Sequence, residues 1–341
     1  MPDKLMPNNK HHAIVIGINN YPLIGLDPLK GPVNDANDFC AWLRDPAGGN
    51  LPPENIQRVL SSDFNPKDAL PTPNQVETLF EKFIGDYYDG KKEGERLYIF
   101  TSGHGFGDPR DIGKTALYAA NAKRMFPWHI AVTDYAEWLR SHAVFDEIVL
   151  IMDCCRTVNL PYEIREPQYV VGQGSIGADS VRYFYAFAAR RGSAAKERKF
   201  EDGRISGIFT KALLDALKVA SPDAQGQVTG QQLKNHLHNS IGRFAGNVTI
   251  KPPDIMLDST QDIVFCKRKA AATIPVKVSL TAYTGAETLV LYDGSFREIR
   301  QVQATTSPLT LALEPGLYKI AVKNTGRQKI IEVPNNEQIT V

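Results

Sequence analysis

Two side chains that can carry out chemistry each follow a run of apolar residues. Residues 97–102 lead to His104, and residues 148–153 lead to the adjacent Cys154 and Cys155. Each run has the composition of a buried β-strand, so each strand would present its reactive residue at its carboxyl end. A histidine and a cysteine on neighbouring parallel strands form a base and a nucleophile, which is the minimum equipment for cysteine-dependent acyl transfer.

The elements that must position these residues alternate between strands and helices up to about residue 267. Near-continuous apolar strands separated by helices predict an α/β fold with a mostly parallel sheet and helices on both faces. In such sheets the functional site lies beyond the carboxyl ends of the strands, where His104 and Cys155 are expected. The expected strands are residues 12–18, 56–60, 96–101, 147–152, 181–188 and 262–266, and the expected helices cover 34–43, 72–87, 209–219 and 229–241, with another from residue 133.

The pattern changes after residue 268. From residue 274 onward, short runs of alternating polar and apolar residues are separated by turn signals such as Asp293-Gly294. This pattern predicts a small all-β sandwich. We therefore expect two domains, residues 1–268 and residues 269–341. The second has no cluster of histidines, cysteines or paired acids, which favours an accessory or docking domain.

Composition limits the partners and the location of the chain. Its net charge of +1 over 341 residues gives no electrostatic reason to expect nucleic acid or an anionic membrane. We find no signal peptide and no run of about 18 apolar residues, so we expect no membrane span. Four cysteines, two of them adjacent, do not make a disulfide framework and favour a reducing, cytoplasmic location. The sequence contains no CxxC motif, so no zinc site is expected.

Residues 11–267 resemble the caspase and metacaspase family of cysteine peptidases, nearer its prokaryotic, metacaspase-like branch. His104 precedes Cys155 by about 50 residues, the spacing known in caspases. The resemblance implies a caspase–haemoglobinase-type fold and cysteine endopeptidase activity for the first domain. Four blocks match the family in order: AIVIGINNYP with LKGPVNDA, YIFTSGHG, LIMDCCR, and AARRGSAAKE followed by GIFTKALLDAL.

The chemistry assigns a role to each residue of these motifs. His104 is the candidate base and later the acid for the leaving amine, and Cys155 is the candidate nucleophile. The backbone N–H groups of Gly105 and Cys155 are the expected oxyanion hole. Adjacent side chains of a strand point to opposite faces, so one of Cys154 and Cys155 faces the cleft and the other the core. The family pattern Asp-x-Cys selects Cys155.

The resemblance also implies a specificity pocket lined by acids. Asp35 and Asp153 match positions where the metacaspase branch carries carboxylates that bind substrate arginine or lysine, and two carboxylates suit a guanidinium. Asp35 could instead be a helix N-terminal residue favoured by the macrodipole, and Asp153 a hydrogen bonder to loop amides. We predict cleavage after Arg or Lys, and not after Asp.

Departures from the family bear on metal binding. Asn159 stands where many metacaspases carry a calcium-binding aspartate, and only Asp108 and Asp111 remain in the loop that follows the histidine motif. Calcium prefers several carboxylate oxygens. We therefore expect no metal or other cofactor, and calcium activation is disfavoured.

A protease that acts after basic residues in the cytosol must be restrained. Residues 161–179 and 190–204 have the composition of exposed, cleavable loops, although charged segments of this kind are also common as solvated connections. Cleavage there, by the enzyme itself or by an upstream protease, would rearrange the active-site loops of a zymogen. The candidate processing sites are Arg165, Arg190, Arg191 and Arg198.

Two functions remain open on sequence grounds. The first is a cysteine endopeptidase that cleaves proteins with exposed Arg or Lys and acts as an effector in signalling, cell death or defence. The alternative is a catalytically silent caspase-like scaffold whose β-sandwich domain recruits partners. The intact His104 and Cys155 favour the enzyme, and resemblance to metacaspases favours a monomer.

Overall fold

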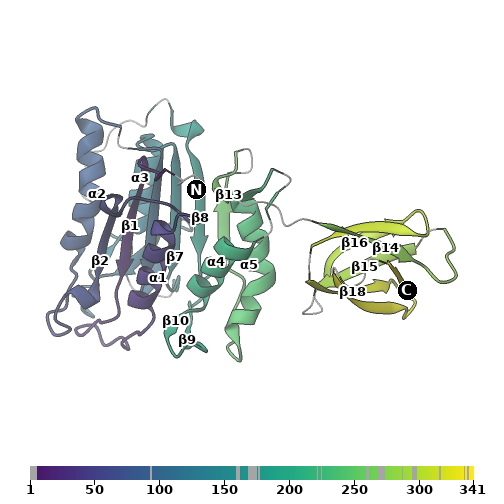
Figure 1. Cartoon of the computed structure of the whole chain (residues 1–341). Helices are drawn as coiled ribbons and strands as arrows, with labels where there is room; N and C mark the ends of the chain where they lie inside the picture. The colour runs from purple at the N-terminus through teal and green to yellow at the C-terminus, as the bar shows by residue number, and fades with distance from the viewer. Residues whose placement is uncertain are drawn as a thin grey trace. The chain divides into compact units, whose positions relative to one another are not determined.

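The chain divides into two compact units, Met1–Arg268 and Lys269–Val341 (Figure 1). Among the residues that the structure describes, no helix combines the length and the apolar composition that a bilayer crossing needs. The computed structural model describes residues 6–92, 94–158, 162–167, 175, 177–220, 222–223, 225–258, 261–267, 273–285, 287–293, 298–314, 316–333, 335 and 338–341.

A six-stranded sheet forms the centre of the first unit, in the order β12-β8-β7-β3-β1-β2. Five of these strands pair in parallel, and only the edge strand β12 pairs antiparallel, with β8. The predicted mostly parallel sheet is confirmed. The strands are β1 (His11–Gly17), β2 (Ile56–Leu60), β3 (Arg96–Ser102), β7 (Glu147–Asp153), β8 (Arg182–Phe187) and β12 (Asp254–Leu257).

Helices cover both faces of this sheet, as predicted. One core cluster joins Ile14 and Ile99 of the sheet to Phe80 of α2 and Tyr135 of α3. The other joins alternate residues of the same strands, such as Val15 and Phe100, to α1, α4 and α5. Because strand side chains alternate between faces, the strands β1, β3, β7 and β8 each contribute to both cores. The helices are α1 (Pro32–Arg44), α2 (Pro73–Tyr88), α3 (Val132–Ser141), α4 (Ile208–Val219) and α5 (Gly230–Ala245), with 3-10 turns at Pro53–Asn55, Ser61–Asp63 and Ala178–Ser180.

Smaller sheets lie beside the central sheet. One of their strands, β13, overlaps the expected strand 262–266, and the other strands were not predicted. A three-stranded sheet has the order β4-β5-β6, and two pairs join β9 to β10 and β11 to β13. The expectation that residues 190–204 form one exposed loop is therefore wrong, because β9 and the hairpin it makes with β10 occupy part of that segment. These strands are β4 (Gly105–Gly107), β5 (Thr115–Tyr118), β6 (His129–Ile130), β9 (Glu197–Lys199), β10 (Ile205–Gly207), β11 (Gln227–Thr229) and β13 (Val264–Lys267).

The second unit is built from two sheets, in the orders β17-β14-β20 and β16-β15-β18-β19. Inward residues of both sheets, such as Val276 and Leu289, share one apolar core. The predicted β-sandwich is confirmed. Its strands are β14 (Ile274–Ser279), β15 (Glu287–Asp293), β16 (Glu298–Ala304), β17 (Leu309–Leu313), β18 (Gly316–Val322), β19 (Gln328–Val333) and β20 (Gln338–Thr340).

Candidate active site

The two central strands bring the reactive residues to one place. β3 and β7 pair in parallel, and Ser102 at the end of β3 lies opposite Asp153 at the end of β7. His104 and Cys155 each follow two residues after this pair, so both lie at the same end of the sheet. Both line a small pocket of about 70 Å³, which we call the reactive pocket. Its lining residues are Leu29, Pro32, Asp35, Ser102, Gly103, His104, Asp153, Cys155, Ala195, Lys196, Glu197 and Gly207.

Backbone contacts orient the ring of His104. Its Nε2 lies 2.9 Å from the carbonyl oxygen of Asp27. A carbonyl can only accept, so Nε2 carries a hydrogen and the neutral ring keeps its free lone pair on Nδ1. The Tyr21 hydroxyl accepts a hydrogen bond from the His104 backbone N–H at 2.9 Å, and the two rings meet edge to face. Nδ1 is therefore the ring atom that is free to accept a proton.

Cys155 and Cys154 have different surroundings. Cys155 is half-buried, and its Sγ lies 4.0 Å from the carbonyl oxygen of Ala195. Burial raises the pKa of the Cys155 thiol, so a base must remove its proton before it can attack. Cys154 is buried in the core beneath the sheet end, and burial raises the pKa of its thiol as well.

The strand β4 turns a backbone N–H toward the reactive side. Gly105 lies opposite Leu117 of β5, and Tyr118 N–H donates to the carbonyl oxygen of His104. This register makes Gly105 a non-hydrogen-bonded position whose N–H points away from β5. A Cβ on Gly105 would lie 2.6 Å from Cys154 Sγ, which explains a glycine here. The use of Gly105 and Cys155 as an oxyanion hole stays a prediction.

The predicted acids Asp35 and Asp153 lie together at the base of the reactive pocket. Asp35 accepts hydrogen bonds from Gly207 N–H at 2.9 Å and Ser102 Oγ at 2.9 Å. Asp153 accepts from Thr210 N–H at 3.0 Å and Thr210 Oγ1 at 2.7 Å. Gly207 and Thr210 belong to the start of α4, whose N-terminus favours anionic groups. The alternative role of Asp153, hydrogen bonding to backbone amides, is thus also present.

Burial makes these two carboxylates difficult to ionise. Asp35 is 1% exposed and Asp153 is 5% exposed. Burial raises the pKa of Asp153 to about 6. Burial, and then the charge of Asp153, raise the pKa of Asp35 well above its usual range. Two buried carboxyl groups that disfavour each other's charge would both be stabilised by a bound cation.

A third acid, Glu197, was not predicted. It lies on β9 and accepts hydrogen bonds from Gly31 N–H at 2.8 Å and Lys30 N–H at 3.2 Å. Gly207 on β10 leaves the space that the pocket needs, because a Cβ there would overlap Asp153 Oδ2 and lie 2.8 Å from its Cγ. No local sequence pattern marks either residue, since both depend on the β9–β10 hairpin.

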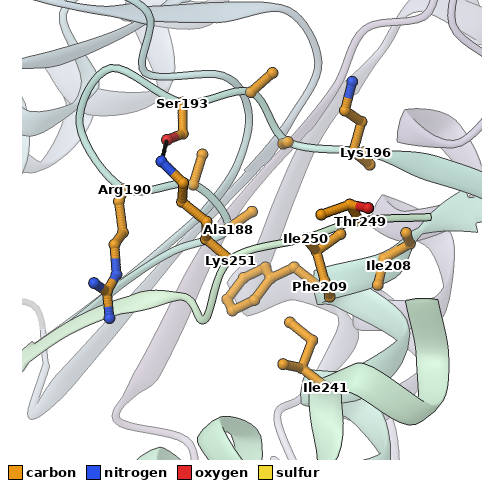
Figure 2. Close-up of a pocket in the computed structure, with 13 residues that line it drawn as sticks. Ala188, Arg190, Ser193, Lys196, Ile208, Phe209, Ile241, Thr249, Ile250 and Lys251 are labelled. Atoms are coloured by element: carbon orange, nitrogen blue, oxygen red, sulfur yellow. Dashed lines mark hydrogen bonds between the residues drawn. The ribbon is translucent and has the colours of Figure 1, made fainter.

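A neighbouring cavity of about 250 Å³ shares Ala195 and Lys196 with the reactive pocket, and we call it the side pocket. Figure 2 shows Phe209, Ile241 and Ile250 on its apolar side. Opposite, the Lys251 ammonium donates to Ser193 Oγ at 3.3 Å. The side pocket could hold an apolar substrate side chain next to the one in the reactive pocket.

Arg156 fixes the segment that carries Cys155, a role that sequence analysis missed. Its guanidinium is buried, lies 4.1 Å over the Phe187 ring, and donates to Thr115 Oγ1 at 3.0 Å and to Asp254 at 2.7 Å. Its backbone also bonds to the loop that lines the side pocket, where its N–H donates to Ser193 O at 2.9 Å. The only signal in the sequence is an arginine directly after a cysteine.

The candidate processing sites differ in accessibility. Arg190 is exposed, whereas Arg191 donates to the carbonyl oxygens of Asp108 and Pro109. Arg198 lies in β9 and packs over the Phe200 ring at 4.4 Å. Arg165 is exposed, but much of its segment, residues 161, 168–174 and 176, lies outside the described residues.

The residues expected to contribute to calcium binding have other partners. Asp108 accepts backbone N–H bonds from Arg110, Asp111 and Ile164, and Asp111 accepts one from Gly113. Asn159 lies outside the described residues. Within the described part of the chain, no group of three or more His, Cys, Asp or Glu is placed to hold a metal ion.

Comparisons with known proteins agree with these motifs. The family model of the caspase domain matches residues 10–245. A protein described as a probable protease from a Desulfuromonadales bacterium is 29% identical over 221 residues, which cover 60% of this chain and 26% of that protein. The chain therefore spans about a quarter of the length of this curated relative.

Two solved caspase structures were also matched. Caspase-1 from Spodoptera frugiperda is 12% identical, with a TM-score of 0.49, covering 78% of this chain and 93% of that chain. The structure titled pro-sf-caspase-1 is 11% identical, with a TM-score of 0.43, covering 74% of this chain and 92% of that chain.

Proposed function

The chain belongs to the caspase-domain family of peptidases, and from this premise we propose that it is a cysteine endopeptidase that cleaves proteins after arginine or lysine. One observation carries the proposal. A single pocket contains an imidazole, a thiol and the carboxylates of Asp35, Asp153 and Glu197. The first two groups provide acyl transfer, and the acids provide a site for a substrate cation.

The proposed reaction begins with proton transfer from Cys155 Sγ to His104 Nδ1. The thiolate attacks the substrate carbonyl carbon, and the resulting oxyanion accepts hydrogen bonds from Gly105 N–H and Cys155 N–H. The C–N bond breaks as the imidazolium gives its proton to the leaving amine, which leaves a thioester on Cys155. Water, deprotonated by His104, then attacks the thioester and releases the acid product with the free thiol.

Charge and space in the reactive pocket support a basic residue before the cleaved bond. A guanidinium can bond to carboxylates through two parallel N–H groups, and it would stabilise the ionised forms of Asp35 and Asp153. A substrate aspartate would add a further negative charge beside these acids. The side pocket supports an apolar residue at a nearby substrate position.

We extend the proposal to the cellular setting with the expectations from sequence. The enzyme is proposed to be a cytoplasmic, monomeric effector in signalling, cell death or defence, activated by cleavage and requiring no metal. The β-sandwich unit is proposed as its docking domain. These statements are supported by the family resemblance and by the need to restrain a protease inside a cell.

Hydrolysis of fluorogenic peptides that end in Arg, Lys or Asp tests the proposal. Arg and Lys peptides should be cleaved, and Cys155→Ala should lose activity by about 1000-fold or more. Cys154→Ala is the matched control and should stay within about threefold of wild type, because its thiol is buried away from the reactive pocket. Preferred cleavage after Asp would contradict the assignment of the acids. No hydrolysis before or after limited trypsin treatment would favour the silent scaffold.

A further inference from the structure

A third cavity in the first unit is larger than the reactive pocket and shares none of its lining residues. It has a volume of about 1310 Å³ and lies between one side of α2, residues 121–129 and residues 162–167. We call it the acidic groove. Its size suits a segment of polypeptide more than a single side chain.

Large apolar side chains are exposed along the acidic groove. Tyr88 is 47% exposed, Met125 81%, Phe126 62% and Trp128 38%. All four line the groove. Isolated exposed apolar residues are normal on a protein surface, but a contiguous group that lines one cavity indicates a surface that binds a partner.

The charges in the groove are mostly negative. Glu77 and Glu81 lie one helical turn apart on α2, whereas Glu163 and Glu166, from the segment that follows the nucleophile, form ion pairs with Arg110 and Lys114. Arg165 is the one Arg or Lys among the described residues that line the groove. Burial raises the pKa of Glu77, so a cation beside it would stabilise its ionised form.

The groove already contains one guanidinium, from its own chain. Arg165 lies 6.0 Å from the centre of the Trp128 ring, and its charge offsets part of the burial effect that raises the pKa of Glu77. A cation over a tryptophan face and near a carboxylate is a favourable arrangement. Arg165 therefore demonstrates which chemistry the walls of the groove accept.

We propose that the acidic groove docks a basic peptide segment of a partner protein, in which Lys or Arg stands beside an apolar side chain. The exposed aromatic residues would contact the apolar side chain, and Glu77 and Glu81 the basic one. The sign of the charge excludes nucleic acids and anionic lipid surfaces as occupants. This goes beyond the peptidase activity, because docking requires neither His104 nor Cys155.

The test is a binding measurement on the full chain carrying Cys155→Ala, so that no peptide is cleaved. Fluorescence anisotropy is measured with a labelled peptide of alternating Lys and Leu, and with the same peptide carrying Glu in place of Lys. The basic peptide should bind and the acidic one should not. Glu77→Gln with Glu81→Gln should weaken binding about tenfold or more, and so should Trp128→Ala.

Matched controls separate docking from general charge and from the reactive pocket. Glu54→Gln and Ile330→Ala remove an exposed acid and an exposed apolar residue elsewhere, and should leave binding unchanged. Phe126→Ala repeats the apolar test at a residue that is too exposed to support the fold. The proposal would be overturned if neither peptide bound, or if the acidic peptide bound as well as the basic one. It would also be overturned if the groove variants had no effect on binding, or if only Asp153→Asn abolished it.

Discussion

Acidification is expected to weaken the binding of a guanidinium in the reactive pocket. Burial raises the pKa of Asp153 to about 6, so its ionised fraction falls from about 97% at about pH 7.5 to about 9% at about pH 5. A ligand that binds the ionised carboxylate should bind about tenfold more weakly at the lower pH. Burial, and then the charge of Asp153, raise the pKa of Asp35 well above its usual range, so a bound guanidinium should lower the pKa of this group as well.

Agmatine, a small guanidinium, provides the assay. Its binding is measured calorimetrically in buffers of different ionisation heat, on a chain carrying Cys155→Ala and His104→Ala, so that the imidazole charge does not contribute. Proton release near about pH 6, where Asp153 is partly protonated, and an affinity loss of about tenfold between about pH 7.5 and about pH 5 are expected. Adding Asp153→Asn should reduce the pH dependence, and the part that remains belongs to Asp35, whose pKa burial also raises. A pH dependence that is unchanged in Asp153→Asn, or constant wild-type affinity between the two pH values, would refute the reasoning.

The same carboxyl group has an opposite effect on stability. Its folded pKa of about 6 exceeds the usual 3.8, so the native state binds more protons between these values and its stability falls as pH rises through them. At about pH 7.5, Asp153→Asn should therefore raise the free energy of unfolding while it weakens agmatine binding. If Asp153 had only a structural role, its replacement would instead lower the free energy of unfolding. Denaturant unfolding of the wild type and the variant distinguishes these two cases.

Two further substitutions test the geometry of the site. Gly207→Ala should lower kcat/KM for arginyl peptides by about 100-fold or more, because the new Cβ would overlap Asp153 Oδ2. Gly242 has open space around it, so Gly242→Ala should leave kcat/KM unchanged. Equal values of kcat/KM for the two variants would contradict this prediction. Arg156→Met should reduce the free energy of unfolding by about 2–4 kcal/mol in urea titrations, because it removes a buried guanidinium from Asp254 and from the buried Thr115 hydroxyl. Arg204→Met, at a more exposed ion pair, should cost about 1 kcal/mol or less. An equal loss at both arginines would show that burial of Arg156 has no special effect.

The central sheet could be predicted because its strands are long and apolar. Residues 96–101 and 147–152 were expected as strands, and β3 and β7 occupy Arg96–Ser102 and Glu147–Asp153. β4 could not be predicted, because three residues show no alternation and its contacts are with distant segments, such as the bridge from Phe106 to Thr157. The edge strand β12 was not predicted either, because its four residues are too few to show an alternating pattern.

The positions of the candidate site residues followed from strand ends and motif resemblance. A parallel sheet places the ends of β3 and β7 side by side, so the sequence was sufficient to bring His104 near Cys155 and Asp153. Glu197 and Gly207 could not be placed in this way. They reach the pocket through a hairpin whose register, with Gly207 opposite Glu197, depends on tertiary contacts of α1 and α4 rather than on local pattern.

The hairpin also bears on how cleavage could regulate the enzyme. Arg198 lies between Glu197 and Gly207. In the continuous chain Glu197 already accepts a hydrogen bond from Gly31 N–H, and Gly207 N–H already donates to Asp35. A cut after Arg198 is therefore not required to build the acidic end of the pocket. Arg190 is different, because its exposed loop contacts Arg156, where Gly192 N–H donates to the Arg156 carbonyl oxygen at 2.7 Å. A cut at Arg190 would therefore release the segment that directly follows Cys155. Arg191 lies on the same loop, but its guanidinium is held by the carbonyl oxygens of Asp108 and Pro109, so we expect the exposed Arg190 to be the site from which cleavage affects the nucleophile.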